Sequence, residues 1–180
     1  LGGLLGDVDV DRAGVVAAGR VVGQDELVAD VGRHGGADLV QLLGVRGGQQ
    51  APTGALYRYD ADGRCTRHDD GFEVTNGPTW SADGRTMYFN NTARNNLYAY
   101  DFDVEAGTVS NRRVWHRFPK PDGLPDGMTT DAAGRLWIAH WGGSCVTCHD
   151  PVSAAELCRI PLPASHVTDC AFGDTDLRTL

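Results

Sequence analysis

The apolar residues of this chain fall into short runs of the kind that form β-strands. Residues 56–60 read Leu-Tyr-Arg-Tyr-Asp, residues 97–101 read Leu-Tyr-Ala-Tyr-Asp, and a weaker copy, Val-Thr-Cys-His-Asp, occupies residues 146–150. Aromatic and β-branched residues favour strands, and the Asp that closes each run is typical of a turn. No helical periodicity competes with this pattern from residue 54 onward, so we predict an all-β structure there.

A longer repeat precedes two further strand-like runs. Residues 76–85 read Asn-Gly-Pro-Thr-Trp-Ser-Ala-Asp-Gly-Arg, and residues 126–135 read Asp-Gly-Met-Thr-Thr-Asp-Ala-Ala-Gly-Arg. The runs that follow them lie at residues 87–89 and 136–139. Units of roughly 40–50 residues with about four strands have the size of propeller blades. We therefore predict a partial β-propeller, about three blades, in residues 51–180.

Asn76 and Asp126 occupy the same position in the two copies of the longer repeat. Equivalent positions in neighbouring propeller blades point at one central axis, so we expect both side chains to present oxygen atoms to a single site. Amide and carboxylate oxygens suit a hard divalent cation. The alternative is that each residue only forms a tight turn before glycine, as Asn-Gly and Asp-Gly pairs often do.

The composition is that of a globular protein and narrows the choice of partners. The 180 residues are 41% hydrophobic and 22% charged, with a formal net charge of −8, which argues against a nucleic-acid or anionic-membrane partner. No apolar run approaches the roughly 20 residues of a membrane helix, and no signal peptide is recognisable. The five cysteines have no framework spacing, so we expect free thiols and a reducing, cytoplasmic location.

The first fifty residues are a different kind of sequence. They contain 12 of the 24 glycines and use only nine residue types: Leu, Gly, Asp, Val, Arg, Ala, Gln, Glu and His. All nine types have codons that begin with G or C, as expected when a GC-rich gene is read in the wrong frame or on the wrong strand. We therefore hypothesise that residues 1–50 are not a native segment. The alternative is a genuine Gly- and Val-rich region with strands at residues 8–10 and 15–22.

Residues 145–149 spell Cys-Val-Thr-Cys-His, the attachment motif of c-type haem. In the repeat this segment takes the place of a strand, where alternation would put Cys145 and Cys148 on opposite faces. We therefore predict a strand, without haem or zinc. The histidines show no metal-ligand spacing, and we expect His140 at a strand end or on the surface.

A set of short motifs runs in fixed order through residues 54–180. They are Gly-Ala-Leu-Tyr-Arg-Tyr-Asp (54–60), Thr-Asn-Gly (75–77), Ser-Ala-Asp-Gly-Arg-Thr-Met-Tyr-Phe (81–89), Tyr-Ala-Tyr-Asp (98–101), Ser-Asn-Arg-Arg-Val (110–114), Leu-Pro-Asp-Gly-Met (124–128), Leu-Trp-Ile-Ala (136–139), Trp-Gly-Gly (141–143) and Thr-Asp-Cys-Ala-Phe-Gly (168–173). In order and spacing these motifs resemble the middle of the senescence-marker-protein/regucalcin/gluconolactonase family.

The resemblance implies a six-bladed lactonase-type β-propeller with one divalent cation on its axis: calcium, zinc, manganese or iron. The family's Asn and Asp ligands carry over to Asn76 and Asp126. Its Glu ligand, and the Arg and Asn that contact substrate, have no counterpart in this chain. Family members also continue beyond the position of Leu180. We therefore expect an incomplete ring that is inactive alone.

Family enzymes hydrolyse sugar lactones, so the resemblance implies metal-dependent hydrolysis of a sugar lactone by the parent protein. The cation would polarise the lactone carbonyl and lower the pKa of a bound water. Asp126 would be the catalytic base as well as a ligand. Two alternatives stay open: a non-enzymatic calcium-binding propeller of the regucalcin type, and a propeller that serves only as an interaction scaffold.

Overall fold

The computed structural model describes most of the chain beyond residue 51 and three strands before it. The described residues are 19–21, 27–34, 37–42, 52, 54–60, 64–175 and 177–180. For the first three ranges, and for residue 59, the description covers the backbone alone. The expected strand at residues 8–10 lies outside the described residues, as does most of the segment to which the reading-frame hypothesis applies.

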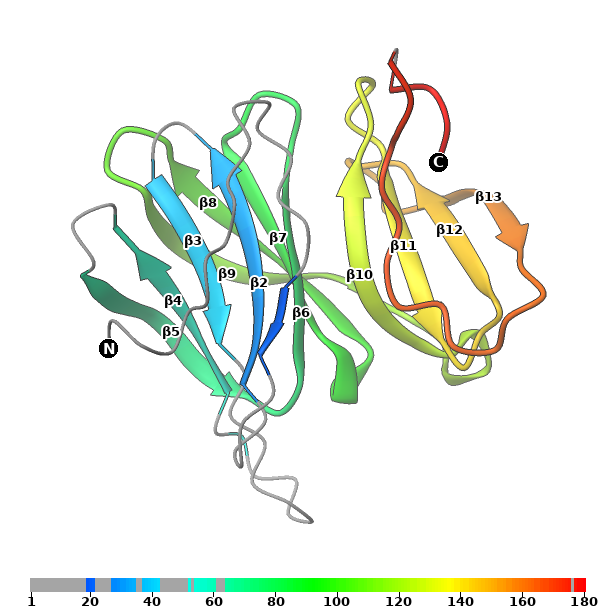
Figure 1. Ribbon diagram of the computed structural model, residues 1–180, viewed down its shortest axis with the longest axis horizontal. Coiled ribbons are helices and arrows are strands. Elements are labelled where there is room, and N and C mark those ends of the chain that lie inside the picture. Colours follow the sequence, from blue (N-terminus) through cyan, green and yellow to red (C-terminus); the bar gives the residue numbers. More distant parts are fainter. Residues whose placement is uncertain are drawn as a thin grey trace.

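The described strands form three antiparallel sheets (Figure 1). The first sheet contains β1 (Gly19–Val21), β2 (Leu27–His34), β3 (Ala37–Leu42), β4 (Gly54–Tyr59) and β5 (Cys65–Phe72). The second contains β6 (Thr75–Trp80), β7 (Thr86–Asn91), β8 (Asn96–Asp103) and β9 (Thr108–Arg117). The third contains β10 (Leu124–Thr130), β11 (Leu136–Trp141), β12 (Cys145–His149) and β13 (Glu156–Pro161). Two short 3-10 helices, η1 (Thr92–Arg94) and η2 (Lys120–Asp122), complete the described secondary structure.

Each sheet has the arrangement of a propeller blade. Strands that follow one another in the chain are hydrogen-bonded neighbours in the sheet. Strand β6 contacts both β2 and β10, so these three strands line the inner side of the array, whereas β13 is exposed along its whole length. The predicted all-β propeller with about three blades is confirmed, and the runs at 56–60, 97–101 and 146–150 fall on β4, β8 and β12. The first sheet, however, takes β1, β2 and β3 from residues before 51, outside the predicted range of 51–180.

The longer repeat folds in the same way in both copies. In the first, the amide of Gly84 donates to the carbonyl oxygen of Ser81 (2.8 Å), and Gly84 has a φ of +70°. In the second, the amide of Gly134 donates to the carbonyl oxygen of Asp131 (2.9 Å), and Gly134 has a φ of +80°. A left-handed conformation at this point favours glycine. The repeated Gly-Arg pair therefore marks the hairpin between the first two strands of each blade.

The core lies between the blades. Met87 and Phe89 of β7 face the first sheet, where they pack with Leu56, while Tyr88, between them, faces the third sheet and packs near Ile138. This alternation follows from the two-residue period of a strand. A third cluster, on the far side of the third sheet, joins Ala139, Val146 and Val167. In the described part of the chain, no helix is long and apolar enough to span a membrane.

Candidate metal and catalytic site

Asn76 and Asp126 lie at equivalent places on neighbouring inner strands. Asn76 is the second residue of β6, and Asp126 is the third residue of β10. In each strand the pairing register shifts at this point, between Asn76 and Thr79 in β6 and between Pro125 and Met128 in β10. Both side chains are half-buried, so they combine a fixed position with access to solvent. The equivalence expected from the repeat thus extends to the backbone irregularity beside each residue.

A hydrogen-bond bridge joins the two strands at this point. The hydroxyl of Thr92 donates its single proton to the carbonyl oxygen of Pro125 (2.7 Å). It must therefore accept its other bond, which comes from Nδ2 of Asn76 (2.8 Å). This arrangement fixes the amide of Asn76 and leaves its Oδ1 available. Asn90, the cross-strand partner of Asn76, donates to the carbonyl oxygen of Asp126 (2.6 Å).

The surroundings of the Asp126 carboxyl group disfavour its ionised form. Burial raises its pKa from the ordinary 3.8 to about 6, and the negative charge of Asp169 adds to this effect. Burial also raises the pKa of Asp169. No ion pair to either carboxylate is found among the described residues. Two neighbouring carboxyl groups without a cationic partner would each gain from a bound positive charge.

Gly127 allows the segment around Asp169 to approach β10. The amide of Gly127 donates to the carbonyl oxygen of Thr168 (2.8 Å). A Cβ atom at Gly127 would lie 2.7 Å from that carbonyl oxygen and 2.6 Å from Cγ of Asp169, closer than side chains tolerate. Asp169 is not among the predicted ligands. The available signal was its place in Thr168-Asp169-Cys170, which aligns with Thr75-Asn76-Gly77.

The oxygen atoms available at this site suit a hard divalent cation, but few side chains supply them. It offers one free amide oxygen, from Asn76, and the carboxylate of Asp126, with Asp169 alongside. Oxygen donors of this kind suit calcium, magnesium or manganese. Within the described ranges, no group of three or more His, Cys, Asp or Glu side chains is arranged to hold a metal ion.

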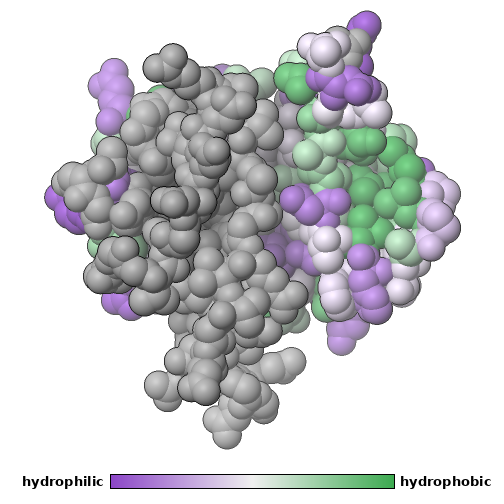
Figure 2. Space-filling model, viewed as in Figure 1, coloured by the Kyte–Doolittle hydropathy of each residue, from purple (hydrophilic) through white to green (hydrophobic). Residues whose placement is uncertain are grey.

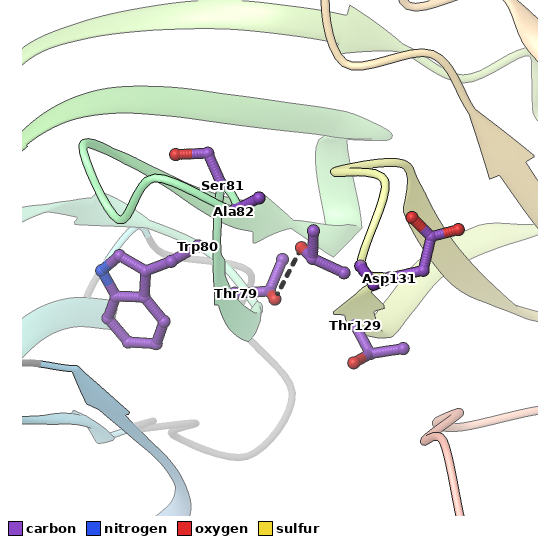
Figure 3. A pocket seen from close by; sticks show the side chains of 8 residues that line it. Thr79, Trp80, Ser81, Ala82, Thr129 and Asp131 are labelled. Atoms are coloured by element: carbon purple, nitrogen blue, oxygen red, sulfur yellow. Dashed lines mark hydrogen bonds between the residues drawn. The ribbon is translucent and has the colours of Figure 1, made fainter. Parts of the chain in front are cut away.

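A groove of about 430 Å³ lies at the other end of the same two strands. It is lined by Thr79, Trp80, Ser81, Ala82, Thr129, Thr130, Asp131 and Ala132. Figure 3 shows a hydrogen bond between the hydroxyl groups of Thr79 and Thr130 (3.0 Å) across this groove. Asn76 and Asp126 do not line it. The groove is therefore separate from the candidate metal site.

His140 lies at a strand end, as expected, but it is buried and not on the surface. Its side chain is 0% exposed, and its ring centroid lies 5.2 Å from that of Phe118. The Cys-Val-Thr-Cys-His segment forms strand β12, as predicted. Cys145 Sγ lies 3.6 Å from the guanidinium of Arg159, whereas Cys148 pairs with Cys158.

Comparison with protein-family models places this chain in a known group. The model for the SMP-30/gluconolactonase/LRE-like region matches residues 5–180. A Bacillus subtilis protein named for sugar lactone lactonase activity is 42% identical over 126 residues, which cover 70% of this chain and 43% of that protein. The pentonolactonase XacC of Haloferax volcanii is 41% identical over 127 residues, covering 71% of this chain and 43% of the relative.

A solved structure and a further sequence relative point to the same family. A calcium-binding regucalcin from Agrobacterium tumefaciens superposes with a TM-score of 0.75 and 28% identity, covering 82% of this chain and 50% of that one. Human regucalcin is 36% identical over 120 residues, which cover 67% of this chain and 40% of the relative. The chain thus spans less than half the length of the curated relatives it matches.

Proposed function

The chain belongs to the SMP-30/gluconolactonase/LRE-like family, and on that premise we propose that its parent protein is a metal-dependent hydrolase of sugar lactones. The observation that carries the proposal is the geometry at β6 and β10. There, Thr92 fixes the amide of Asn76 beside the peptide that leads into Asp126. Relatives named for lactonase activity toward sugar lactones and pentonolactones support the choice of reaction and substrate.

Asn76 and Asp126 have distinct roles in this proposal. Asn76 supplies a neutral oxygen, held in one orientation by Thr92. Asp126 supplies a negative charge, and Asp169 adds to the negative potential beside it. The chemistry that a divalent cation supplies at such a site is Lewis-acid activation of a carbonyl group and of water. Calcium and manganese suit the oxygen donors of this site, and zinc and iron are candidates through the family resemblance.

Asp126 also takes a proton from the attacking water. A carboxylate that is half-buried and beside a second carboxyl group is a stronger base than one in water. Ring opening needs one proton removed from water and one delivered to the leaving oxygen, and a single carboxyl group can perform both transfers in turn. The product is the open-chain hydroxy acid.

Cation binding by the 180-residue chain is the first test. Isothermal titration calorimetry with calcium, manganese and zinc is expected to detect one site. Asn76→Leu and Asp126→Asn should each weaken it by about 10-fold or more. Asp83→Asn, which alters an exposed hairpin carboxylate, is the matched control and should leave the affinity unchanged. Equal affinities in all four proteins would reject Asn76 and Asp126 as ligands.

Hydrolysis is tested on the parent protein by following acid release from gluconolactone. Asp126→Asn is expected to lower kcat by about 100-fold or more, the usual contribution of a general base. We expect the 180-residue chain alone not to hydrolyse the lactone, because among the residues that the structure describes no group of three or more His, Cys, Asp or Glu side chains is arranged to hold a metal ion. Measurable turnover by this chain would contradict that expectation.

A non-enzymatic calcium-binding propeller is the second candidate, favoured by the calcium-binding regucalcin among the similar structures. The two candidates share the cation site and differ in turnover. A parent protein that binds calcium through Asn76 and Asp126 but hydrolyses none of a panel of aldonolactones would support this second function.

A further inference from the structure

Two cysteines lie directly opposite each other on strands β12 and β13, which run side by side in Figure 1. The register pairs Cys148 of β12 with Cys158 of β13. Cys148 is buried and Cys158 is exposed, and both are free thiols. The remaining three cysteines lack such a partner in the register: Cys65 pairs with Tyr59, Cys145 pairs with Pro161, and Cys170 lies outside the strands.

The spacing of the two strands suits a covalent bond between these residues. The amide of Leu162 donates to the carbonyl oxygen of Ser144 (2.8 Å), just beyond the ends of the strands. Ser144 and Leu162 are therefore a hydrogen-bonded pair, and the register continues without a shift from there to Cys148 and Cys158. Hydrogen-bonded pairs recur at every second position of an antiparallel ladder, so Cys148 and Cys158, four positions further on, also form such a pair. The Cα atoms of a hydrogen-bonded antiparallel pair lie roughly 5.5 Å apart. Disulfides usually join Cα atoms roughly 4.4–6.8 Å apart.

The two thiols also interact with each other. Burial raises the pKa of Cys148 to about 11, and its neighbour Cys158 adds to the increase through charge and through a side-chain hydrogen bond. The positive charge of Arg135 interacts electrostatically with both cysteines. A nearby cation and solvent access are the features of oxidisable cysteines, and Cys158 combines them.

We propose that Cys148 and Cys158 form a reversible redox-modification site, in which a peroxide converts the two thiols into a disulfide across β12 and β13. The site is distinct from the proposed lactonase site, because Asp126 lies on β10, two strands away in the same sheet. It does not depend on the proposed function. Its expected effect is to fasten the exposed edge strand β13 to the blade.

The reaction balances in two steps. The Cys158 thiolate attacks one oxygen of hydrogen peroxide, the O–O bond breaks, and a sulfenic acid and water result after protonation. The Cys148 sulfur then attacks the Cys158 sulfur. The S–O bond breaks, and the oxygen leaves as a second water with the proton of Cys148. Two thiols lose two electrons, and one peroxide is reduced to two waters. A dithiol reductant reverses the bond by thiol–disulfide exchange.

The test compares reduced and peroxide-treated full-length chain. After oxidation and alkylation in denaturant, the protein is expected to have lost two of its five thiols. Peptide mass spectrometry should then find one cross-linked peptide that contains Cys148 and Cys158. The melting temperature of the oxidised chain should rise by several degrees and return after reduction, because a cross-link restricts the unfolded chain.

Cys158→Ser tests the proposal without disturbing the interior, because its side chain is exposed. This variant should form no cross-linked peptide and show no rise in melting temperature. Cys65→Ser, at another exposed cysteine, is the matched control and should behave as wild type. Three results would each overturn the proposal: Cys158 oxidised to sulfenic or sulfinic acid without a bridge, a bridge between other cysteines, or no loss of thiols.

Discussion

At the scale of single residues, the most informative feature is the pair of carboxyl groups of Asp126 and Asp169. Their closeness depends on Gly127, because any larger side chain there would collide with Asp169. Like charges in a partly buried position disfavour ionisation. The pair therefore stores unfavourable electrostatic energy that a bound cation would relieve.

Asp169→Asn removes one of these charges and leaves the shape nearly unchanged. We expect the pKa of Asp126 to fall from about 6 toward its ordinary value of 3.8, though not to reach it, because burial persists. Cation affinity should fall by about 10-fold through the lost attraction. Carboxyl-carbon NMR titration of the cation-free chain measures the first effect, and calorimetry measures the second. An unchanged pKa for Asp126 would show that the two carboxyl groups are not coupled.

His140 belongs to a chain of hydrogen bonds whose proton positions can be deduced. The carbonyl oxygen of Ala154 can only accept, so His149 donates to it from Nδ1 (3.0 Å). Nε2 of His149 then accepts from Thr147 (3.0 Å), and Thr147 accepts from Nε2 of His140 (2.7 Å). Nδ1 of His140 is buried without a partner among the described residues. These directions hold for neutral rings, and burial favours the neutral form because it lowers the pKa of both imidazoles.

Acidification should destabilise the fold through His140. Burial lowers its pKa from 6.5 to about 4, so between these values the unfolded chain binds a proton that the folded chain does not. The contribution of His140 to the free energy of unfolding is fully present above pH 6.5. It is lost as the pH falls toward 4, and the loss amounts to about 3 kcal/mol. Asp126 opposes this trend between pH 3.8 and about 6, because its pKa is raised.

Comparing variants isolates the contribution of His140. Urea unfolding of wild type and His140→Gln from pH 7.5 to 4.5 should show a weaker pH dependence in the variant, because glutamine does not titrate and can still donate to Thr147. His166→Gln, at an exposed histidine, is the control and should follow wild type. Parallel profiles for all three proteins would show that protonation of His140 does not limit stability in acid.

At the scale of elements, the strands that the sequence predicts are those with apolar or repeated residues. The runs on β4, β7, β8 and β11 carry buried side chains, so their composition reflects their position. The outer strands β9 and β13 are largely exposed and mix apolar with polar residues without a strict alternation, so the pattern does not reveal them. Asn76 and Asp126 could be selected because they recur in register. Asp169 and the buried position of His140 depend on contacts between distant segments, which a local pattern does not encode.

Strands β6 and β10 are joined by side-chain hydrogen bonds of one threonine near each end, Thr92 and Thr79. Replacing each threonine in turn separates the role of the two bridges. Thr92→Val removes the bridge between Asn76 and Pro125, and Thr79→Val removes the bond to Thr130. Each should lower the free energy of unfolding by about 1–2 kcal/mol. Only Thr92→Val frees the amide of Asn76, so only this variant should also weaken cation binding, by about 10-fold. Equal cation affinity in the two variants would show that Thr92 does not position Asn76.

At the scale of the whole molecule, the apolar core joins blades to one another. One cluster connects Leu56 and Phe72 of the first sheet with Met87 and Phe89 of the second. The next connects Leu97 of the second sheet with Leu136 of the third. Beyond it, apolar residues gather on the visible surface of the third sheet (Figure 2). Neighbouring blades therefore stabilise each other, and we expect the second and third sheets to unfold together.

Leu136→Ala tests this coupling, because Leu136 is 0% exposed and packs in the cluster between the second and third sheets. Truncating a fully buried leucine should lower the free energy of unfolding by about 2–5 kcal/mol. Leu157→Ala, on the outer strand β13 where the side chain is 52% exposed, should change it by less than about 0.5 kcal/mol. Hydrogen exchange followed by mass spectrometry should show Leu136→Ala reducing protection in β7 and β8 as much as in β11 and β12. If only β11 and β12 lose protection, the blades unfold independently, and the cluster between them contributes little to the stability of the second sheet.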